Sequence, residues 1–219
     1  MKYIKTPVYE FSELDEDTKQ KVIDKERTFY FDCMFEDDLH LWLFDSDTCP
    51  LINSGVSIDS LKDLSYDLSN YQYDHVAFRE CTLDKDVLIE KSGVMEFIEN
   101  AWRNTSVSAQ DYIDNISISW SLPYARDYFC SSGHVAIDDC AFYNDKFEAM
   151  ANAISEELEA KLSEYMHDLQ QKLYDYLIDN VNHATSDETI IENLNPDMVY
   201  DAQGNSYTRE EMEMDMSEE

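Results

Sequence analysis

The chain has 219 residues, with 48 Asp and Glu against 16 Lys and Arg, and a formal net charge of −32. Hydrophobic residues make up 43% and aromatic residues 13%. This composition can bury a core and excludes a disordered acidic chain for most of the length, because such chains are poor in aromatic residues. The charge disfavours free nucleic acid and anionic membranes as partners, and it favours a basic protein surface.

Segments that would direct the chain to a membrane or out of the cell are not evident. No apolar run reaches the roughly 18 residues that span a bilayer, and the N-terminus lacks the apolar core of a secretory signal. We therefore predict a cytoplasmic protein. Its five cysteines include no C-x-x-C pair, and we expect them to be buried free thiols: Cys33, Cys49, Cys81, Cys130 and Cys140.

The first predicted element is an amphipathic helix that begins near Ser12. We expect Ser12 and Asp15 to form its capping box. Two i,i+4 ion pairs are expected to follow, Asp15–Lys19 and Asp17–Lys21. The apolar positions expected to face the core are Leu14, Val22 and Phe29. The local concentration of basic residues is therefore explained by helix chemistry and does not indicate a nucleic-acid patch.

Short elements are predicted for the middle of the chain. Helical spacing of apolar residues favours helices at 34–44 and 92–102. Strands are expected at 66–69, 76–83, 115–122 and 134–140. The strand at 115–122 has the clearest pattern, because Ile116, Ile118 and Trp120 alternate with serines.

A long helix is predicted from Asp145 to about Ala184, where Gly and Pro are absent and an apolar stripe persists. It is expected either to break near Ser163 or to pair with a second helix or subunit. A short helix capped by Ser186 and a tight turn around Gly204 should follow. The predicted fold class is α+β, a small antiparallel sheet covered by helices, with a long C-terminal helix. The expected parts are an α+β domain at 1–144, the long helix with its terminal helix and turn at 145–207, and a flexible acidic tail at 208–219.

Three stretches together resemble one protein family. Residues 9–23 follow the pattern YxFxELxxxxKxKVI, which resembles the opening of a family of small proteins encoded in tailed-phage genomes, some of them labelled antitoxin. Gln72, Asp74 and Phe78 match an internal QGDG-like turn, although Tyr73 and His75 replace its glycines. Residues 186–207 resemble the family's SDE-x-I-I-E segment and its ending. The resemblance implies phage origin, and hence activity inside a bacterial host.

Candidate catalytic and metal sites are weak. The spacing of Cys130, His134 and Cys140 fits no structural zinc pattern. His75 follows Asp74, but adjacent residues on a strand point to opposite faces, so a turn with a hydrogen-bonding Asp is favoured over an acid–base pair. Asp45 and Asp47 begin like a calcium loop that Cys49-Pro50 then breaks. We predict no catalytic residue, no metal and no cofactor, and therefore no enzyme.

The long helix carries the candidate binding residues. Its non-apolar face is rich in carboxylates, which could approximate an array of phosphates, although an ordinary solvated helix face would have the same composition. The residues predicted to bind a partner are Glu148, Glu156, Glu157, Glu159, Glu164, Asp168, Asp175 and Asp179.

Three functions of different classes follow. The leading hypothesis is a phage-encoded inhibitor of a host defence nuclease, such as a CRISPR effector or a restriction enzyme, whose basic groove it occupies as an acidic nucleic-acid mimic. It would contact neither nucleic acid nor membrane directly, and it could form a homodimer through the long helix. The alternative is an antitoxin-like protein that neutralises a toxin through a shaped interface. The third is a metal-dependent hydrolase.

Overall fold

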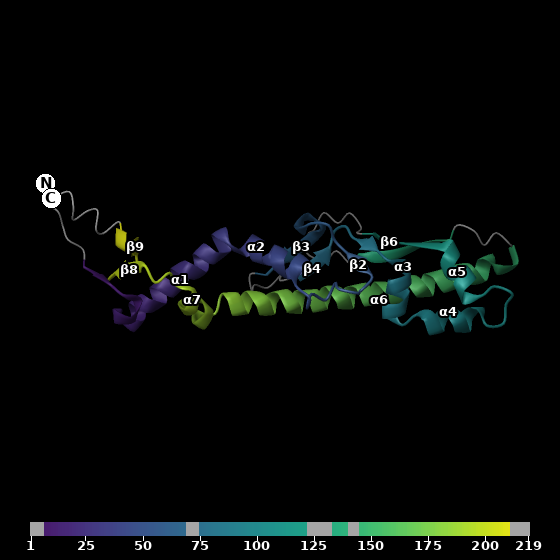
Figure 1. The fold of residues 1–219 in the computed structure, drawn as a ribbon. Coiled ribbons are helices and arrows are strands. Elements are labelled where there is room, and N and C mark those ends of the chain that lie inside the picture. The colour runs from purple at the N-terminus through teal and green to yellow at the C-terminus, as the bar shows by residue number, and fades with distance from the viewer. Residues whose placement is uncertain (1–6, 69–74, 122–132, 140–144, 211–219) are drawn as a thin grey trace. The chain divides into compact units, whose positions relative to one another are not determined.

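The computed structural model describes residues 7–68, 75–121, 133–139 and 145–210. It has the predicted mixed α+β class, with small antiparallel sheets and the long helix α6 (Asp145–Ala184) (Figure 1). The chain divides into two compact units. Unit 1 comprises Met1–Leu39 with Asp179–Glu219, and unit 2 comprises His40–Ile178. The boundaries predicted at residues 144 and 207 stay a prediction.

Unit 1 joins the two ends of the chain. A three-stranded antiparallel sheet has the order β1-β8-β9, so that the first strand pairs with β8 close to the C-terminal end. Leu14, Val22 and Tyr200 are buried together at its core. The elements are β1 (Val8–Tyr9), η1 (Phe11–Glu13), α1 (Glu16–Cys33), α2 (Phe35–His40, whose last residue belongs to unit 2), α7 (Asp187–Asn193), β8 (Met198–Asp201) and β9 (Ser206–Thr208).

The start of α1 differs from the prediction. Asp15 is its N-cap, and its carboxylate accepts the Thr18 N–H at 2.8 Å. Ser12 lies in the preceding turn η1 and does not cap α1, because Leu14 extends the chain between them. Since Asp15 is engaged at the cap, Lys19 pairs instead with Glu16, at 2.9 Å. The expected capping box and the Asp15–Lys19 pair were therefore wrong.

The predicted core face of α1 is correct for Leu14 and Val22, which are buried, and wrong for Phe29, which is 54% exposed. Phe29 lies in the last part of the helix. Helical periodicity places it near the Val22 side, but burial also needs a neighbouring element at that level of the helix.

Unit 2 is built from short elements and most of α6. Its sheets are two-stranded pairs, β2-β5, β3-β4 and β6-β7, all antiparallel. The elements are η2 (Leu41–Asp45), β2 (Val56–Ser57), η3 (Leu61–Asp63), β3 (Leu64–Asp67), β4 (His75–Phe78), β5 (Thr82–Leu83), α3 (Lys85–Ser92), α4 (Met95–Trp102), α5 (Ala109–Asn115), β6 (Ile116–Ser121) and β7 (His134–Asp139).

Several helices and strands differ from their predicted ranges. The helix expected at 34–44 divides into α2 and the π-helical turn η2. The one expected at 92–102 is confirmed as α4, which begins at Met95, and the preceding α3, which was not predicted, ends at Gly93, whose φ is +71°. The strand expected at 76–83 divides into β4 and β5. The strands at 115–122 and 134–140 are confirmed as β6 and β7, and α7 is capped by Ser186 as predicted.

The apolar stripe of α6 is the core of unit 2. Leu158, Leu162, Leu173 and Leu177 have no exposed surface, and neither has Met166. The helix continues through Ser163 without a break. Its apolar side is therefore covered within the chain, so a homodimer through this helix would have to use its polar side. That dimer stays a prediction.

Side chains of α6 complete the open edge of β7. Ser163 accepts the Val135 N–H at 2.9 Å, and Glu159 accepts the Ile137 N–H at 2.8 Å. One turn further along the helix, the His167 Nε2 donates to the Gly133 carbonyl at 2.9 Å. These bonds satisfy backbone groups that a third strand would otherwise pair.

The hairpin between β8 and β9 is held by one buried carboxylate. Asp201 is 3% exposed, and its oxygens accept the N–H groups of Gln203 and Asn205 and the Tyr207 hydroxyl. Burial opposes ionisation, but the hydrogen bonds outweigh it, so the pKa of Asp201 lies below its ordinary value of 3.8. The Lys25 ammonium then ties the hairpin to α1 by donating to the Gly204 carbonyl at 2.8 Å.

We expect Asp201→Asn to destabilise the protein by about 1–2 kcal/mol at neutral pH, since an amide cannot accept all of these hydrogen bonds. The folded pKa is depressed, so the carboxylate's contribution is complete above the unfolded value of 3.8 and is lost as pH falls below that value and through the lower folded pKa. Urea unfolding should show a difference in free energy of unfolding between wild type and Asp201→Asn that is constant above this pH and shrinks below it. A gap that stays constant at low pH, or that exposed Asp32→Asn reproduces, would contradict the assignment.

Candidate functional site

Thiol chemistry finds little support among the described cysteines. Cys33, Cys49 and Cys81 are free, but only Cys49 is buried as predicted, while Cys33 is exposed. Burial, and then the neighbouring Asp63 carboxylate, raise the pKa of Cys81 to about 12. Its thiol is therefore protonated at neutral pH and is a poor nucleophile. Cys130 and Cys140 lie outside the described residues, and His134 is an exposed residue at the start of β7.

His75 has a different partner from the one considered in the sequence. Its Nε2 lies 3.1 Å from the Ser65 hydroxyl, and it is paired in register with Asp67, across the β3-β4 hairpin. Asp74 lies outside the described residues. Ser, His and Asp on one face suggest a nucleophilic triad, but Ser65 lies within a regular paired strand. Such a position lacks the free, convergent backbone N–H groups that an oxyanion requires, so we assign a structural hydrogen bond.

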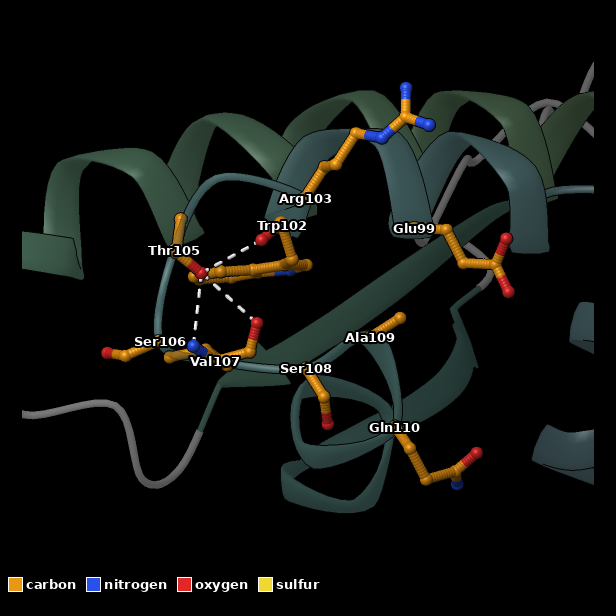
Figure 2. Close-up of a pocket in the computed structure, with 9 residues that line it drawn as sticks. All are labelled: Glu99, Trp102, Arg103, Thr105, Ser106, Val107, Ser108, Ala109 and Gln110. Atoms are coloured by element: carbon orange, nitrogen blue, oxygen red, sulfur yellow. Dashed lines mark hydrogen bonds between the residues drawn. The ribbon is translucent and has the colours of Figure 1, made fainter.

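A hollow of about 520 Å³ lies between the end of α4 and the start of α5 (Figure 2). The buried Trp102 ring lines it, and two hydroxyls of the lining bond to nearby backbone: Thr105 Oγ1 accepts the Val107 N–H, and Ser108 caps α5. Figure 2 shows Arg103 and Glu99 extending away from Trp102. Polar groups do not converge here as they do in a catalytic pocket.

Neither a cluster of metal ligands nor a membrane-spanning helix is found in the described ranges. Nowhere in them do three or more His, Cys, Asp or Glu side chains gather as metal ligands. Among the helices of these residues, none has both the length and the apolar character needed to cross a bilayer.

Four of the predicted carboxylates form a stripe along α6. Glu157, Glu164, Asp168 and Asp175 are exposed and follow one another at intervals of seven, four and seven residues. At 3.6 residues per turn they lie within about 40° around the helix axis and span roughly 27 Å. We call these four residues the acidic stripe. Within the described part of the chain, Glu164 and Asp168 make neither a hydrogen bond nor an ion pair, so their carboxylates are available to a partner.

The other two members of the stripe have weak local partners. Lys161 lies 3.6 Å from Glu157, and the Gln171 side-chain amide donates to Asp175 at 2.8 Å. Both pairs are on the surface, where such interactions contribute about 0–1 kcal/mol, so either can be exchanged for a contact with a partner.

The remaining predicted residues are not part of the stripe. Glu156 is exposed, about 100° around the axis from Glu157. Glu159 is half-buried and bonded to β7. Asp179 belongs to unit 1, and the side chain of Glu148 lies outside the described residues. Sequence periodicity alone could not single out Glu159, because its role depends on the position of β7.

The stripe is sparse compared with nucleic acid. Its four charges over roughly 27 Å amount to about one per 9 Å, whereas duplex DNA has about one per 1.7 Å of axis. Lys161 and Lys172 on the same helix lower the net charge further. The stripe alone therefore does not reproduce a duplex, and most of the negative charge of −32 lies elsewhere on the chain.

Comparisons with known proteins give no relative. No protein-family model, no curated protein and no solved structure matches the chain. The resemblance to the tailed-phage family stays a prediction from the residues that carry it.

The role of Glu159 in the fold can be tested against its neighbour on the helix. We expect Glu159→Ala to destabilise unit 2 by about 1–2 kcal/mol, because the Ile137 N–H loses its acceptor, and to speed hydrogen exchange at that amide. Glu159→Gln keeps a hydrogen-bond acceptor and should reduce the stability of unit 2 much less. The matched control is Glu156→Ala, which removes an exposed carboxylate from the same helix. Equal losses from Glu159→Ala and Glu156→Ala would count against the assignment.

Proposed function

We propose that this protein is an acidic inhibitor that binds the basic nucleic-acid-binding surface of a bacterial host protein, such as a defence nuclease. The observation that carries the proposal is the acidic stripe, with carboxylates fixed on a rigid helix and exposed to solvent. The net charge of −32 supports it, since a basic surface is the partner that such a charge attracts. The resemblance to a tailed-phage family implies that the target is a protein of a bacterial host.

The proposed mechanism is competition. Lysine and arginine side chains that normally bind phosphates would pair with carboxylates of the stripe, and DNA or RNA would be excluded from the same surface. Because the stripe is sparser than a duplex, we propose partial mimicry: it covers a few phosphate positions, and other contacts supply the remaining affinity. An antitoxin-like inhibitor that acts through a shaped interface differs from this in depending little on salt.

The test is a variant that neutralises three of the four carboxylates of the stripe without removing bulk: Glu164→Gln, Asp168→Asn and Asp175→Asn. The control changes three exposed carboxylates elsewhere, Glu80→Gln, Glu96→Gln and Glu192→Gln, for the same change in net charge. With exposed ion pairs each contributing about 0.5 kcal/mol, we expect the stripe variant to bind its target roughly tenfold more weakly than the control does.

The measurement starts with capture from a bacterial lysate at low and high salt, followed by identification of the bound proteins by mass spectrometry. The captured protein is then purified, and its binding to DNA is measured with and without each variant. We expect wild type to compete with DNA at low salt and to lose that competition as salt rises. Equal weakening in the stripe variant and the control, or competition that is insensitive to salt, would contradict the proposal.

A further inference from the structure

The junction between α1 and α2 carries large apolar side chains that the fold leaves exposed. Phe31 is 43% exposed, and Met34, three residues later, is 48% exposed. Residues three and four apart share a helix face, and the Phe31 ring contacts Phe35 at 5.7 Å between centroids. We call Phe31, Met34 and Phe35 the aromatic patch. Single exposed apolar residues are common on proteins, whereas a contiguous group of them is typical of an interaction surface.

A buried tyrosine holds the patch in place. Tyr30 is 8% exposed, and its ring packs edge-to-face on Phe31 at 5.6 Å and on Phe35 at 6.4 Å. Aromatic rings fixed in this way lose little conformational entropy when a partner covers them, which favours their use as binding anchors.

Acidic residues surround the patch. From Thr28 to Leu39 the chain has four acidic residues and no Lys or Arg. Asp32, Glu36 and Asp37 are exposed, and Asp38 is half-buried. Arg27, the nearest base along α1, is engaged with Asp24 and Asp187. The rim of the patch therefore presents negative charge.

We propose that the aromatic patch is a docking site for a positively charged protein surface that offers an apolar pocket between its basic side chains. This rests on the proposed function and deepens it, because it names the anchor that gives the basic partner its specificity. We argue for a basic partner from charge complementarity, because the acidic rim favours a positively charged surface and disfavours a negatively charged one. A second copy of the chain is disfavoured, because a two-fold contact would place Asp32, Glu36 and Asp37 against the same residues.

The probe is an amphipathic helical peptide of leucine and lysine, compared with a serine–lysine peptide of equal charge. We expect wild type to bind the leucine–lysine peptide about tenfold more tightly, as burial of a single anchor can provide. Phe31→Ser with Met34→Ser should remove that preference and leave the binding of the serine–lysine peptide unchanged. The control, Ile52→Ser with Ile191→Ser, changes residues that are 47% and 43% exposed and should keep the preference.

A measurement on unmutated protein guards against misfolding of the patch variant. In protein labelled with ¹³C-methyl methionine, the leucine–lysine peptide should shift the Met34 signal, assigned through Met34→Leu. The signals of Met95, 36% exposed in unit 2, and of the buried Met166 should stay in place.

The outcomes separate this proposal from the proposed function. Neutralising the acidic stripe should weaken both peptides equally and leave the leucine preference intact. Absence of that preference in wild type, or equal shifts at Met34 and Met95, overturns the docking site and leaves the capture test of the stripe standing. If sedimentation shows a dimer that Phe31→Ser with Met34→Ser dissociates, a second copy occupies the patch and the proposal is wrong.

Discussion

Unit 2 depends on the match between the repeat of α6 and the repeat of strand β7. Four residues of helix advance about 6.0 Å, and two residues of strand advance about 6.7 Å. Glu159, Ser163 and His167 are therefore able to reach the backbone at Ile137, Val135 and Gly133 in succession. A two-stranded sheet is marginal by itself, and an open edge exposes unpaired backbone groups. The helix supplies what a third strand would otherwise provide.

The packing of α6 against β7 and its other neighbours determines which of its polar residues stay exposed. One side bonds to β7, and the hydroxyls of Tyr165 and Tyr176 bond to the carbonyls of Ser54 and Trp42 on other segments of unit 2. Leucines fill the side between the packed layers. The carboxylates of the acidic stripe occupy what remains, so part of the stripe's regularity follows from helix periodicity and from the occupation of the other faces. This is why neutralising the stripe has to be compared with neutralising other acids.

Patterns local in sequence predicted the fold best. The absence of Gly and Pro with a sustained apolar stripe predicted α6, strict alternation predicted β6, and Ser186 and Gly204 marked a cap and a turn. Helix α5 was missed although Ser108 and Asp111 form its capping box, a signal that the sequence contained. The exposure of Phe29 and the internal bond of Glu159 could not be predicted, because both depend on which distant segment packs beside them.

Charge alone cannot select one basic protein from many. At physiological ionic strength the Debye length is about 8 Å, so attraction between exposed groups is screened beyond the first contacts and acts mainly on the rate of encounter. Selection needs surface that a wrong partner cannot cover, and burial of apolar side chains supplies it with little dependence on salt. Phe31 and Met34 expose such surface on a helix whose neighbouring Tyr30 is fixed by packing. An inhibitor that combined both features would bind quickly through its carboxylates and stay bound through its aromatic contact, because each feature acts on a different step of association.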